Sequence, residues 1–205
     1  MKHTSKSSAN LSASEDGVFV HESAVIDDGA VLESGVKVWH FCHVMEGSRL
    51  GTGTSLGQNS FVASGVVTGS NCKIQNNVSL YQGVTLGDDV FLGPSCVFTN
   101  VVNPRSAIVR RDAYAPTKVG DGVTIGANAT IICGVELGNF AFVGAGAVVT
   151  RDVKSFELVV GNPAKRIGWM SPSGMRLEFD ESNFSVCTES GEKFRLDAEN
   201  NVYPC

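Results

Sequence analysis

The sequence has little of several features that would fix a function early. Only 18% of its 205 residues are charged, the formal net charge is -5, and there are four histidines. An acidic balance argues against a general nucleic-acid binder or a binder of anionic membranes. Because no run of eighteen apolar residues and no signal peptide is present, we expect a soluble, cytoplasmic protein with no membrane partner.

Metal-binding spacings are also missing. None of the six cysteines forms a Cys-x-x-Cys pair, and the histidines do not follow a zinc-site spacing. We therefore expect no metal. Cys42, Cys72 and Cys96 instead recur at the same phase of a repeat, which favours a packing role.

What the sequence does contain is a period of six. From Val20 to Phe98 every sixth residue is large and apolar, apart from Thr68, and the pattern resumes from Val119 to Val149. A small or β-branched residue stands two positions before each large one, as Ala24 does before Ile26. A short period kept this long is typical of a solenoid.

The period predicts which solenoid. A helix would place apolar residues three and four apart, whereas six with a small partner fits short strands separated by tight corners. Three repeats make one triangular coil of eighteen residues, and coils stack by parallel pairing at roughly 4.8 Å. We predict an all-β parallel β-helix of about seven coils. A β-sandwich would not keep one phase over so many repeats.

The rhythm also divides the chain. Residues 1–16 are polar and aperiodic and are predicted to be a mobile leader, followed by the β-helix over 17–167. The rhythm breaks once, near 101–115, where an inserted loop leaves and re-enters one corner. Residues 168–205 alternate like strands around Ser190-Gly191 and are expected to form a small β appendage that covers the open end.

Outward residues eighteen apart should stack in columns. One column is the least charged, and we predict that it is buried against another subunit. A second runs from Val31 and Arg49 to Glu136 and Lys154. The members of the first column are Val25, His43, Phe61, Ser79, Val97, Thr130 and Val148.

Two candidates for chemistry lie near that first column. His43 belongs to it and His40 stands at the corner before it, so both are either packed interface residues or groups that orient a substrate. The amides at the next corners, Gln58, Asn59 and Asn77, are either turn residues or readers of a nucleotide sugar.

The inserted loop carries Arg105, Arg110 and Arg111 and no histidine. Arginines suit a diphosphate or a carboxylate, although a solvated charged loop is the alternative. The last corners expose Gly126, Ala127, Gly144 and Ala145, where bare backbone permits a ligand to lie close.

These features together resemble a known family. The periodicity over residues 18–167 and the closing segment 160–167 resemble the left-handed β-helix of the hexapeptide-repeat acyltransferases; the hand comes from this resemblance, because the general crossover rule favours the right hand. Further runs resemble the nucleotide-sugar 3-N-acetyltransferases, most of all those acting on UDP-2-acetamido-3-amino-2,3-dideoxyglucuronate for lipopolysaccharide. These runs are 39–43, 56–59, 74–81, 93–100, 103–105 and 126–131.

The resemblance implies acetyl-CoA as cosubstrate and a homotrimer with active sites between subunits. It also implies direct attack of the sugar amine on the thioester, positioned by the protein without a side-chain base. The roles it suggests are catalytic for His40, His43 and Asn77, and substrate-binding for Gln58, Asn59, Lys73, Tyr81, Gln82 and Arg105. Coenzyme binding is suggested for Gly126, Ala127, Gly144, Ala145, Asn162, Lys165 and Arg166.

Three alternatives stay open. The sugar could be a dTDP-3-amino-3,6-dideoxyhexose, which similar proteins acetylate. A non-catalytic β-helix scaffold, or an ice- or surface-binding protein, would show repeated threonine or charge ladders, which this mixed surface does not. A carbonic anhydrase-like trimer would need three zinc histidines, but only His21, His40 and His43 lie in the repeats.

Overall fold

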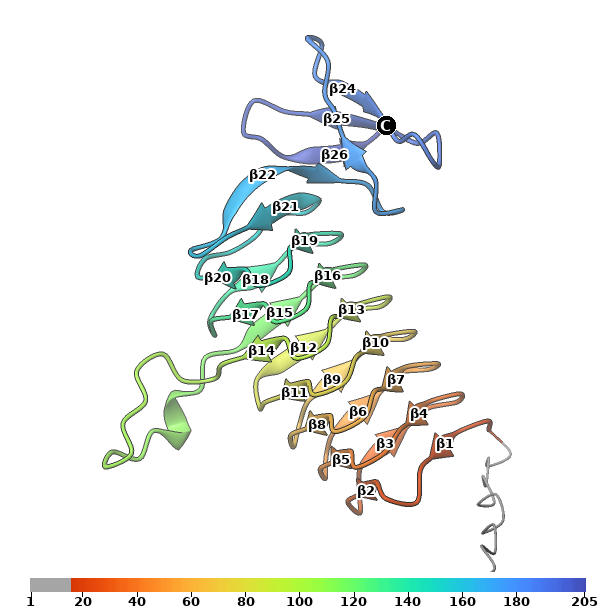
Figure 1. Ribbon diagram of the computed structural model, residues 1–205, viewed down its shortest axis with the longest axis vertical. Coiled ribbons are helices and arrows are strands. Elements are labelled where there is room, and N and C mark those ends of the chain that lie inside the picture. Colours follow the sequence, from red (N-terminus) through yellow and green to blue (C-terminus); the bar gives the residue numbers. More distant parts are fainter. Residues whose placement is uncertain (1–15) are drawn as a thin grey trace, which may run out of the picture.

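A computed structural model describes residues 16–205. Three sheets of very short parallel strands wrap around one core, and Figure 1 shows their strands stacked coil upon coil along the long axis of the molecule. Most strands contain two residues, because the chain turns a corner after each pair of residues.

The first sheet has ten strands, and its last two pairings, β21 with β22 and β22 with β23, are antiparallel. Its strands are β1 (Phe19–Val20), β4 (Lys37–Val38), β7 (Ser55–Leu56), β10 (Lys73–Ile74), β13 (Phe91–Leu92), β16 (Thr124–Ile125), β19 (Phe142–Val143), β21 (Glu157–Val160), β22 (Lys165–Met170) and β23 (Arg176–Leu177).

The second sheet has seven strands and the third has six. The second comprises β2 (Val25–Ile26), β5 (His43–Val44), β8 (Phe61–Val62), β11 (Ser79–Leu80), β14 (Val97–Phe98), β17 (Thr130–Ile131) and β20 (Val148–Val149). The third comprises β3 (Val31–Leu32), β6 (Arg49–Leu50), β9 (Val67–Thr68), β12 (Val84–Leu86), β15 (Thr117–Val119) and β18 (Glu136–Leu137).

Residues predicted to stack in one column, eighteen apart in the sequence, pair with each other in the structure. His43 pairs with Val25 on one side and with Phe61 on the other, so the least charged column runs along the second sheet. The seven strands of that sheet match the predicted seven coils, and β21 opens a further turn. The all-β prediction is confirmed, and the architecture is a parallel β-helix consistent with the left-handed form.

The register slips in the last turn. The eighteen-residue spacing predicts Lys154 opposite Glu136, but Leu137 bridges to Val153, so that prediction is wrong. The reason is Asp152, whose side-chain Oδ1 accepts the hydrogen bond from the Glu136 amide at 2.8 Å. The carboxylate takes the place of a backbone carbonyl, and the turn closes two residues early.

Inward side chains form one continuous core. Cys42, Cys72 and Cys96 are fully buried in it, as their phase in the repeat predicts. Thr68, the one polar residue at a large position, is buried as well, and its hydroxyl accepts a hydrogen bond from Gly51 N at 3.2 Å.

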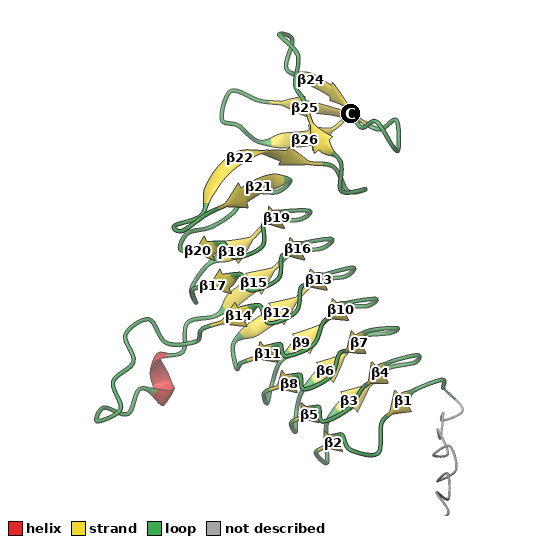
Figure 2. Cartoon of the chain, viewed as in Figure 1, coloured by secondary structure: helices red, strands yellow, loops and turns green. Residues whose placement is uncertain are grey.

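The inserted loop leaves the β-helix after β14 and returns to it at β15, at the same corner. The amide of Ala115 donates to the carbonyl of Asn100 at 3.0 Å, which closes its base. Figure 2 shows the loop as an arm beside the coils, carrying the single helical turn of the described residues, the 3-10 helix η1 (Arg111–Ala113). The inserted loop was predicted near 101–115.

The C-terminal segment covers the last turn. A separate antiparallel sheet holds β24 (Phe184–Val186), β25 (Lys193–Leu196) and β26 (Val202–Pro204). Its Phe194 packs edge-on to Phe156 of the last turn, ring centroids 5.7 Å apart, in a second small core. The appendage was predicted as a strand pair, and β26 is an addition. The boundary near 167/168 falls inside β22.

The predicted leader lies outside the described residues except for Asp16, whose carbonyl accepts the amide of Gly35 at 3.0 Å. Across residues 16–205, no helix has the length and apolar character needed to cross a membrane.

Candidate active site

The three sheets meet at three edges, and two of them matter here. The first edge joins the first sheet to the second through the turns 39–42, 57–60, 75–78, 93–96, 126–129 and 144–147. The second edge joins the second sheet to the third and includes turns 45–48, 63–66 and 81–83 and the arm. The predicted site residues divide between these edges.

The corner amides form a ladder on the first edge. Asn59 and Asn77 both have left-handed backbone angles, with φ of 60° and 62°, so the turn role is real. Their side chains also bond to each other, Asn59 Nδ2 donating to Asn77 Oδ1 at 3.0 Å, while Asn76 Oδ1 accepts from Gln58 N at 2.9 Å. Asn77 therefore keeps its NH2 group available on an exposed turn.

The two candidate histidines lie in different settings. His40 stacks on His21 at the first edge with 3.5 Å between ring centroids. His43 points outward from the second sheet, where its Nε2 is 3.0 Å from Asp27 Oδ1 and its ring meets the edge of Phe61. Asp27 was missed in the sequence because it precedes His43 by sixteen residues instead of eighteen.

A cavity of about 270 Å³ lies beside the first edge. Its lining combines aromatic rings, amides and one hydroxyl, and includes Trp39, His40, Ser55, Gly57, Gln58, Ile74, Gln75 and Asn76. Sequence reasoning assigned a site role to two of these residues, His40 and Gln58. Trp39, Gly57 and Gln75 were detectable as one stacked column, and Asn76 as the residue stacked on Gln58, because each stands eighteen residues from the next.

Farther along the same edge, the predicted coenzyme residues follow one another. A Cβ on Gly126 would lie 2.4 Å from Ala145 N, and a Cβ on Gly144 would lie 2.7 Å from Val160 Cγ1. At Gly126 the colliding atoms are backbone, so coil stacking demands glycine there, whereas at Gly144 the close atom is a side-chain methyl group of Val160. Ala127 is half-buried, as both glycines are, and Ala145 is exposed.

The closing segment lies against the end of this edge. Val148 N donates to Gly161 O at 2.9 Å and Ala164 N donates to Val148 O at 2.8 Å. Asn162, Lys165 and Arg166 are exposed. The guanidinium of Arg166 lies over the ring of Trp169, 4.8 Å from its centroid, so it is held by a cation–π contact.

Tyr81 and Gln82 lie on the second edge, across the second sheet from the amide ladder. The ring of Tyr81 is 6.1 Å from that of Phe61. Gln82 lines a shallow cavity of about 470 Å³ with Glu46, Ser64 and residues of the turn at 28–29. Within one chain, Gln82 therefore lies on a different edge from Asn59 and Asn77.

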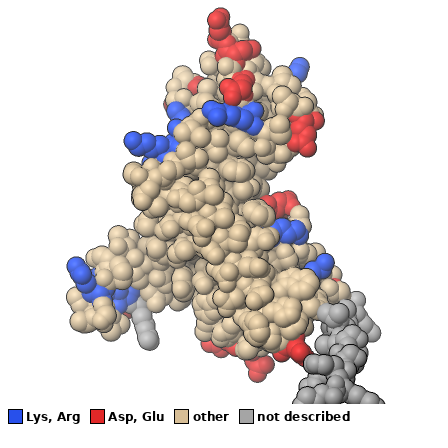
Figure 3. All heavy atoms as spheres, viewed as in Figure 1, with Lys and Arg blue, Asp and Glu red and all other residues tan. Residues whose placement is uncertain are grey.

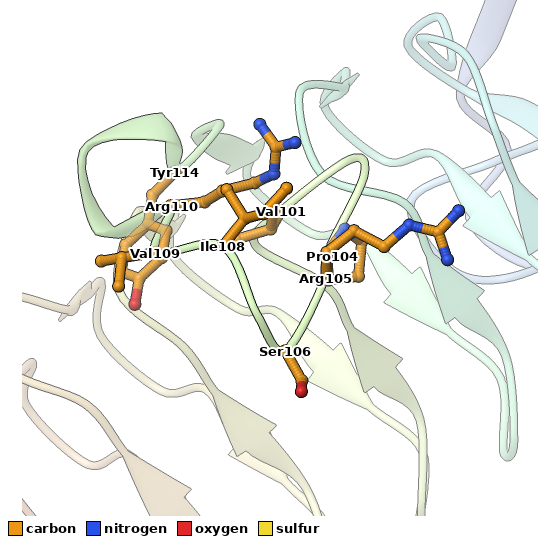
Figure 4. A pocket seen from close by; sticks show the side chains of 8 residues that line it. All are labelled: Val101, Pro104, Arg105, Ser106, Ile108, Val109, Arg110 and Tyr114. Atoms are coloured by element: carbon orange, nitrogen blue, oxygen red, sulfur yellow. The ribbon is translucent and has the colours of Figure 1, made fainter.

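The arm, which also leaves from the second edge, has its own cavity of about 460 Å³. Its lining includes Val101, Pro104, Arg105, Ser106, Ile108, Val109, Arg110 and Tyr114. Figure 4 shows the guanidinium groups of Arg105 and Arg110 pointing in different directions, and the hydroxyl of Tyr114 pointing away from both. The arm also presents apolar side chains, with Val109 85% exposed.

Charge is unevenly distributed over the surface. In the view of Figure 3, Lys and Arg gather on the arm and towards the C-terminal end, with a largely uncharged surface between them, while further Lys, Arg, Asp and Glu side chains lie on the right side of the coils. No cluster of three metal-binding side chains occurs in the part of the chain that the structure describes.

The cysteines beside the first edge cannot readily act as nucleophiles. Burial raises the pKa of the Cys42 thiol and raises the pKa of the Cys96 thiol to about 12. Since the thiolate is the reactive form, neither is suited to carry an acyl group.

Comparison with known proteins agrees with the repeat pattern. The profile of a family described as "Bacterial transferase hexapeptide (six repeats)" matches residues 65–100 and 116–151, on both sides of the arm. Within these two ranges the chain is similar to the hexapeptide repeats of bacterial transferases.

Two curated relatives share part of these repeats. A dTDP-3-amino-3,6-dideoxy-alpha-D-galactopyranose 3-N-acetyltransferase of Aneurinibacillus thermoaerophilus is 38% identical over 41% of this chain and 43% of its own length. A 2,3,4,5-tetrahydropyridine-2,6-dicarboxylate N-acetyltransferase of Staphylococcus aureus is 43% identical over 40% of this chain and 31% of its own. The chain thus spans less than half the length of these relatives.

Solved structures are similar more distantly. The UDP-N-acetylglucosamine O-acyltransferase of Moraxella catarrhalis is 18% identical with a TM-score of 0.49, over 73% of this chain and 74% of that one. The acetyltransferase domain of PglB from Neisseria gonorrhoeae, in complex with acetyl coenzyme A, is 21% identical with a TM-score of 0.47, over 73% and 57%.

Proposed function

We propose that this protein is an acetyl-CoA-dependent N-acetyltransferase acting on an amino group of a nucleotide-linked sugar. The observation that carries the proposal is the first edge, where exposed amides and bare alanine surface follow one another along a single line. A polar substrate and an extended thioester could therefore meet on one edge. The hexapeptide repeats, and two relatives named as N-acetyltransferases, support the same activity.

The site is completed by a second copy in this proposal. The second sheet exposes Val25 and Val97 at 54% and 47%, and it separates the first edge from the second. When three triangular prisms pack their second sheets around a threefold axis, the first edge of each comes beside the second edge of its neighbour. A homotrimer would thus bring Tyr81, Gln82 and Arg105 of one subunit to the amide ladder of the next.

The coenzyme lies along Ala127 and Ala145, with its phosphates near Lys165 and Arg166 and with Asn162 at the turn between. The exposed methyl groups leave backbone accessible, and the two cations match a charged phosphate group. No metal takes part in this scheme.

For the acceptor we propose UDP-2-acetamido-3-amino-2,3-dideoxyglucuronate, in cytoplasmic synthesis of a lipopolysaccharide sugar. Arg105 suits its carboxylate or diphosphate, and Lys73 is exposed on the first sheet. A dTDP-3-amino-3,6-dideoxyhexose is an equal candidate, because one relative is named for that sugar class.

The reaction needs no side-chain base. The neutral sugar amine attacks the thioester carbonyl, the carbon–sulfur bond breaks, and the coenzyme sulfur takes the proton that the nitrogen loses. His40, His43 and Asn77 orient the acceptor, and a backbone amide near the carbonyl oxygen stabilises the developing charge.

A thiol-release assay with acetyl-CoA tests the proposal. We expect free coenzyme A only when a UDP- or dTDP-linked 3-amino sugar is present, with the corresponding 3-hydroxy sugar as control. Comparison of turnover with the UDP-linked and the dTDP-linked amino sugar shows which nucleotide the substrate carries. Absence of thiol release with every amino sugar would refute the enzyme and favour a scaffold.

A further inference from the structure

We propose that the cavity beside the first edge binds a pyrimidine nucleoside diphosphate, with its base on Trp39 and His40 and its diphosphate between Lys37 and Lys73. This inference rests on the proposed function, since it assigns the nucleotide part of the substrate to particular residues. Four features of the cavity lead to it.

The first feature is a fixed aromatic platform. The rings of Trp39 and His40 are nearly parallel, with planes only 6° apart and centroids 6.4 Å apart. Phe19 supports Trp39 at 5.1 Å, and His21 supports His40 at 3.5 Å. Trp39 is nevertheless 42% exposed, so a supported flat surface is open to a planar ligand.

The second feature is a gap above the platform. Trp39, Gly57 and Gln75 occupy one column, and Gly57 contributes no side chain to it. A Cβ there would lie 2.5 Å from Asn76 Oδ1, so the position is restricted to glycine. No side chain therefore lies between those of Trp39 and Gln75, which are two coil spacings, roughly 9–10 Å, apart in the column and both line the cavity.

The third feature is a set of amides at the rim. Gln58, Gln75 and Asn76 all line the cavity. Within residues 16–205, only Asn76 among these side chains takes part in a hydrogen bond, accepting from Gln58 N. Each amide offers both donors and an acceptor, which matches the alternating C=O, N–H and C=O edge of uracil or thymine.

The fourth feature is a pair of cations beside the cavity. Lys37 pairs with Ser55, and Ser55 pairs with Lys73, so the cavity-lining hydroxyl has an exposed lysine on either side. The Nζ of Lys73 is held by Asn71 Oδ1 at 2.8 Å and by Gly53 O at 3.4 Å. One N–H of its ammonium group remains for an anion.

The size of the cavity suits a nucleobase. At about 270 Å³ it is smaller than the roughly 300–1,000 Å³ typical of drug-sized ligands. A single ring with part of its ribose fits within this volume. The diphosphate would then lie outside, along the first sheet.

The test is calorimetric titration of the full chain, without acetyl-CoA, against UDP, dTDP, uridine and ADP. We expect UDP and dTDP to bind more tightly than ADP. Trp39→Ala should raise the Kd for UDP roughly 5- to 150-fold, the range for one base–aromatic stack. Trp39→Phe keeps a ring and should recover most of the affinity.

Two further comparisons sharpen the test. Phe184→Ala removes an aromatic side chain of similar exposure, 41%, on the C-terminal sheet, and should leave the Kd unchanged. Lys37→Ala and Lys73→Ala should weaken the binding of UDP but not that of uridine, because only UDP carries the diphosphate. Circular dichroism of each variant verifies folding.

Equal UDP affinity in folded Trp39→Ala and in the unsubstituted protein would overturn the proposal, as would ADP binding as tightly as UDP. Its failure is distinct from failure of the enzyme assignment. If the protein releases thiol but Trp39→Ala leaves the Kd for UDP unchanged, the enzyme assignment stands and the nucleotide site is refuted. Trp39-dependent UDP binding without thiol release would support the site and refute the enzyme.

Discussion

Replacing Gly126 by alanine separates two explanations of the bare first edge. If coil stacking demands the glycine, the added methyl group should destabilise the fold. Its Cβ would lie 2.4 Å from Ala145 N and 2.7 Å from Ala145 Cα, whereas ordinary contacts are 3.4–4 Å. The neighbouring coils would have to part locally by about 1 Å, because both colliding atoms belong to the backbone.

The cost follows from the hydrogen bonds at this point. Gly126 N donates to Val143 O at 2.7 Å and Gly146 N donates to Ala127 O at 2.8 Å. Parting the coils would stretch both bonds. The bond to the buried Val143 would cost about 1–3 kcal/mol and the bond of the exposed Gly146 about 0.5–1.5 kcal/mol, so we expect a loss of about 1.5–4.5 kcal/mol in the free energy of unfolding.

Gly146→Ala is the matched control. Gly146 has φ of 70° but nothing within 4 Å of a Cβ, so alanine there should cost only the strain of a left-handed residue, about 1–2 kcal/mol. Urea unfolding at one fixed protein concentration measures both variants. A Gly126→Ala variant no less stable than Gly146→Ala would refute the stacking argument and leave ligand contact as the reason for the glycine.

The remaining predictions concern function. Ala127→Trp or Ala145→Trp should raise the KM for acetyl-CoA without unfolding the coil. An unchanged KM in both variants would show that the coenzyme does not bind along this edge. Arg105→Ala should weaken nucleotide-sugar binding by about 1.5–3 kcal/mol while the affinity for acetyl-CoA stays constant, as titration with each ligand would reveal. His40→Asn and His43→Asn should slow turnover modestly; a loss of roughly 100- to 10,000-fold, with loss of the pH dependence near the ordinary histidine pKa, would make that histidine the base. Light scattering should give the mass of three chains, and a result of 21.6 kDa, the mass of one chain, would refute the trimer.

Much of the fold was predictable because each repeat is determined locally. Two residues form a strand, a left-handed residue turns the corner, and the large residue points inward, so the period alone gives the register. The pairing of Val25, His43 and Phe61 follows directly from the spacing of eighteen. Asp152 broke the period because a side chain can replace a backbone acceptor, and nothing in the hydrophobic pattern reports that exchange.

The candidate site was predictable only in part, since columns indicate which residues stack but not what their side chains contact. The sequence indicated His43, whereas the structure added its partner Asp27. Sequence reasoning also grouped Gln82 with the corner amides Asn59 and Asn77, although the second sheet separates them within one chain. The repeat pattern tells which coil a residue belongs to. Only the three-sided cross-section of the folded β-helix determines on which edge that residue lies.

By itself, the sequence determined the β-helix, its stacked columns, the buried cysteines and the position of the arm, because these depend on spacing along the chain. The tertiary structure decided the slip in the last turn, the third strand of the cap and the paired rings of Trp39 and His40 above Phe19 and His21. These depend on side-chain directions and on contacts between coils. Such contacts join residues that a repeat pattern treats as equivalent, and the fold makes them different.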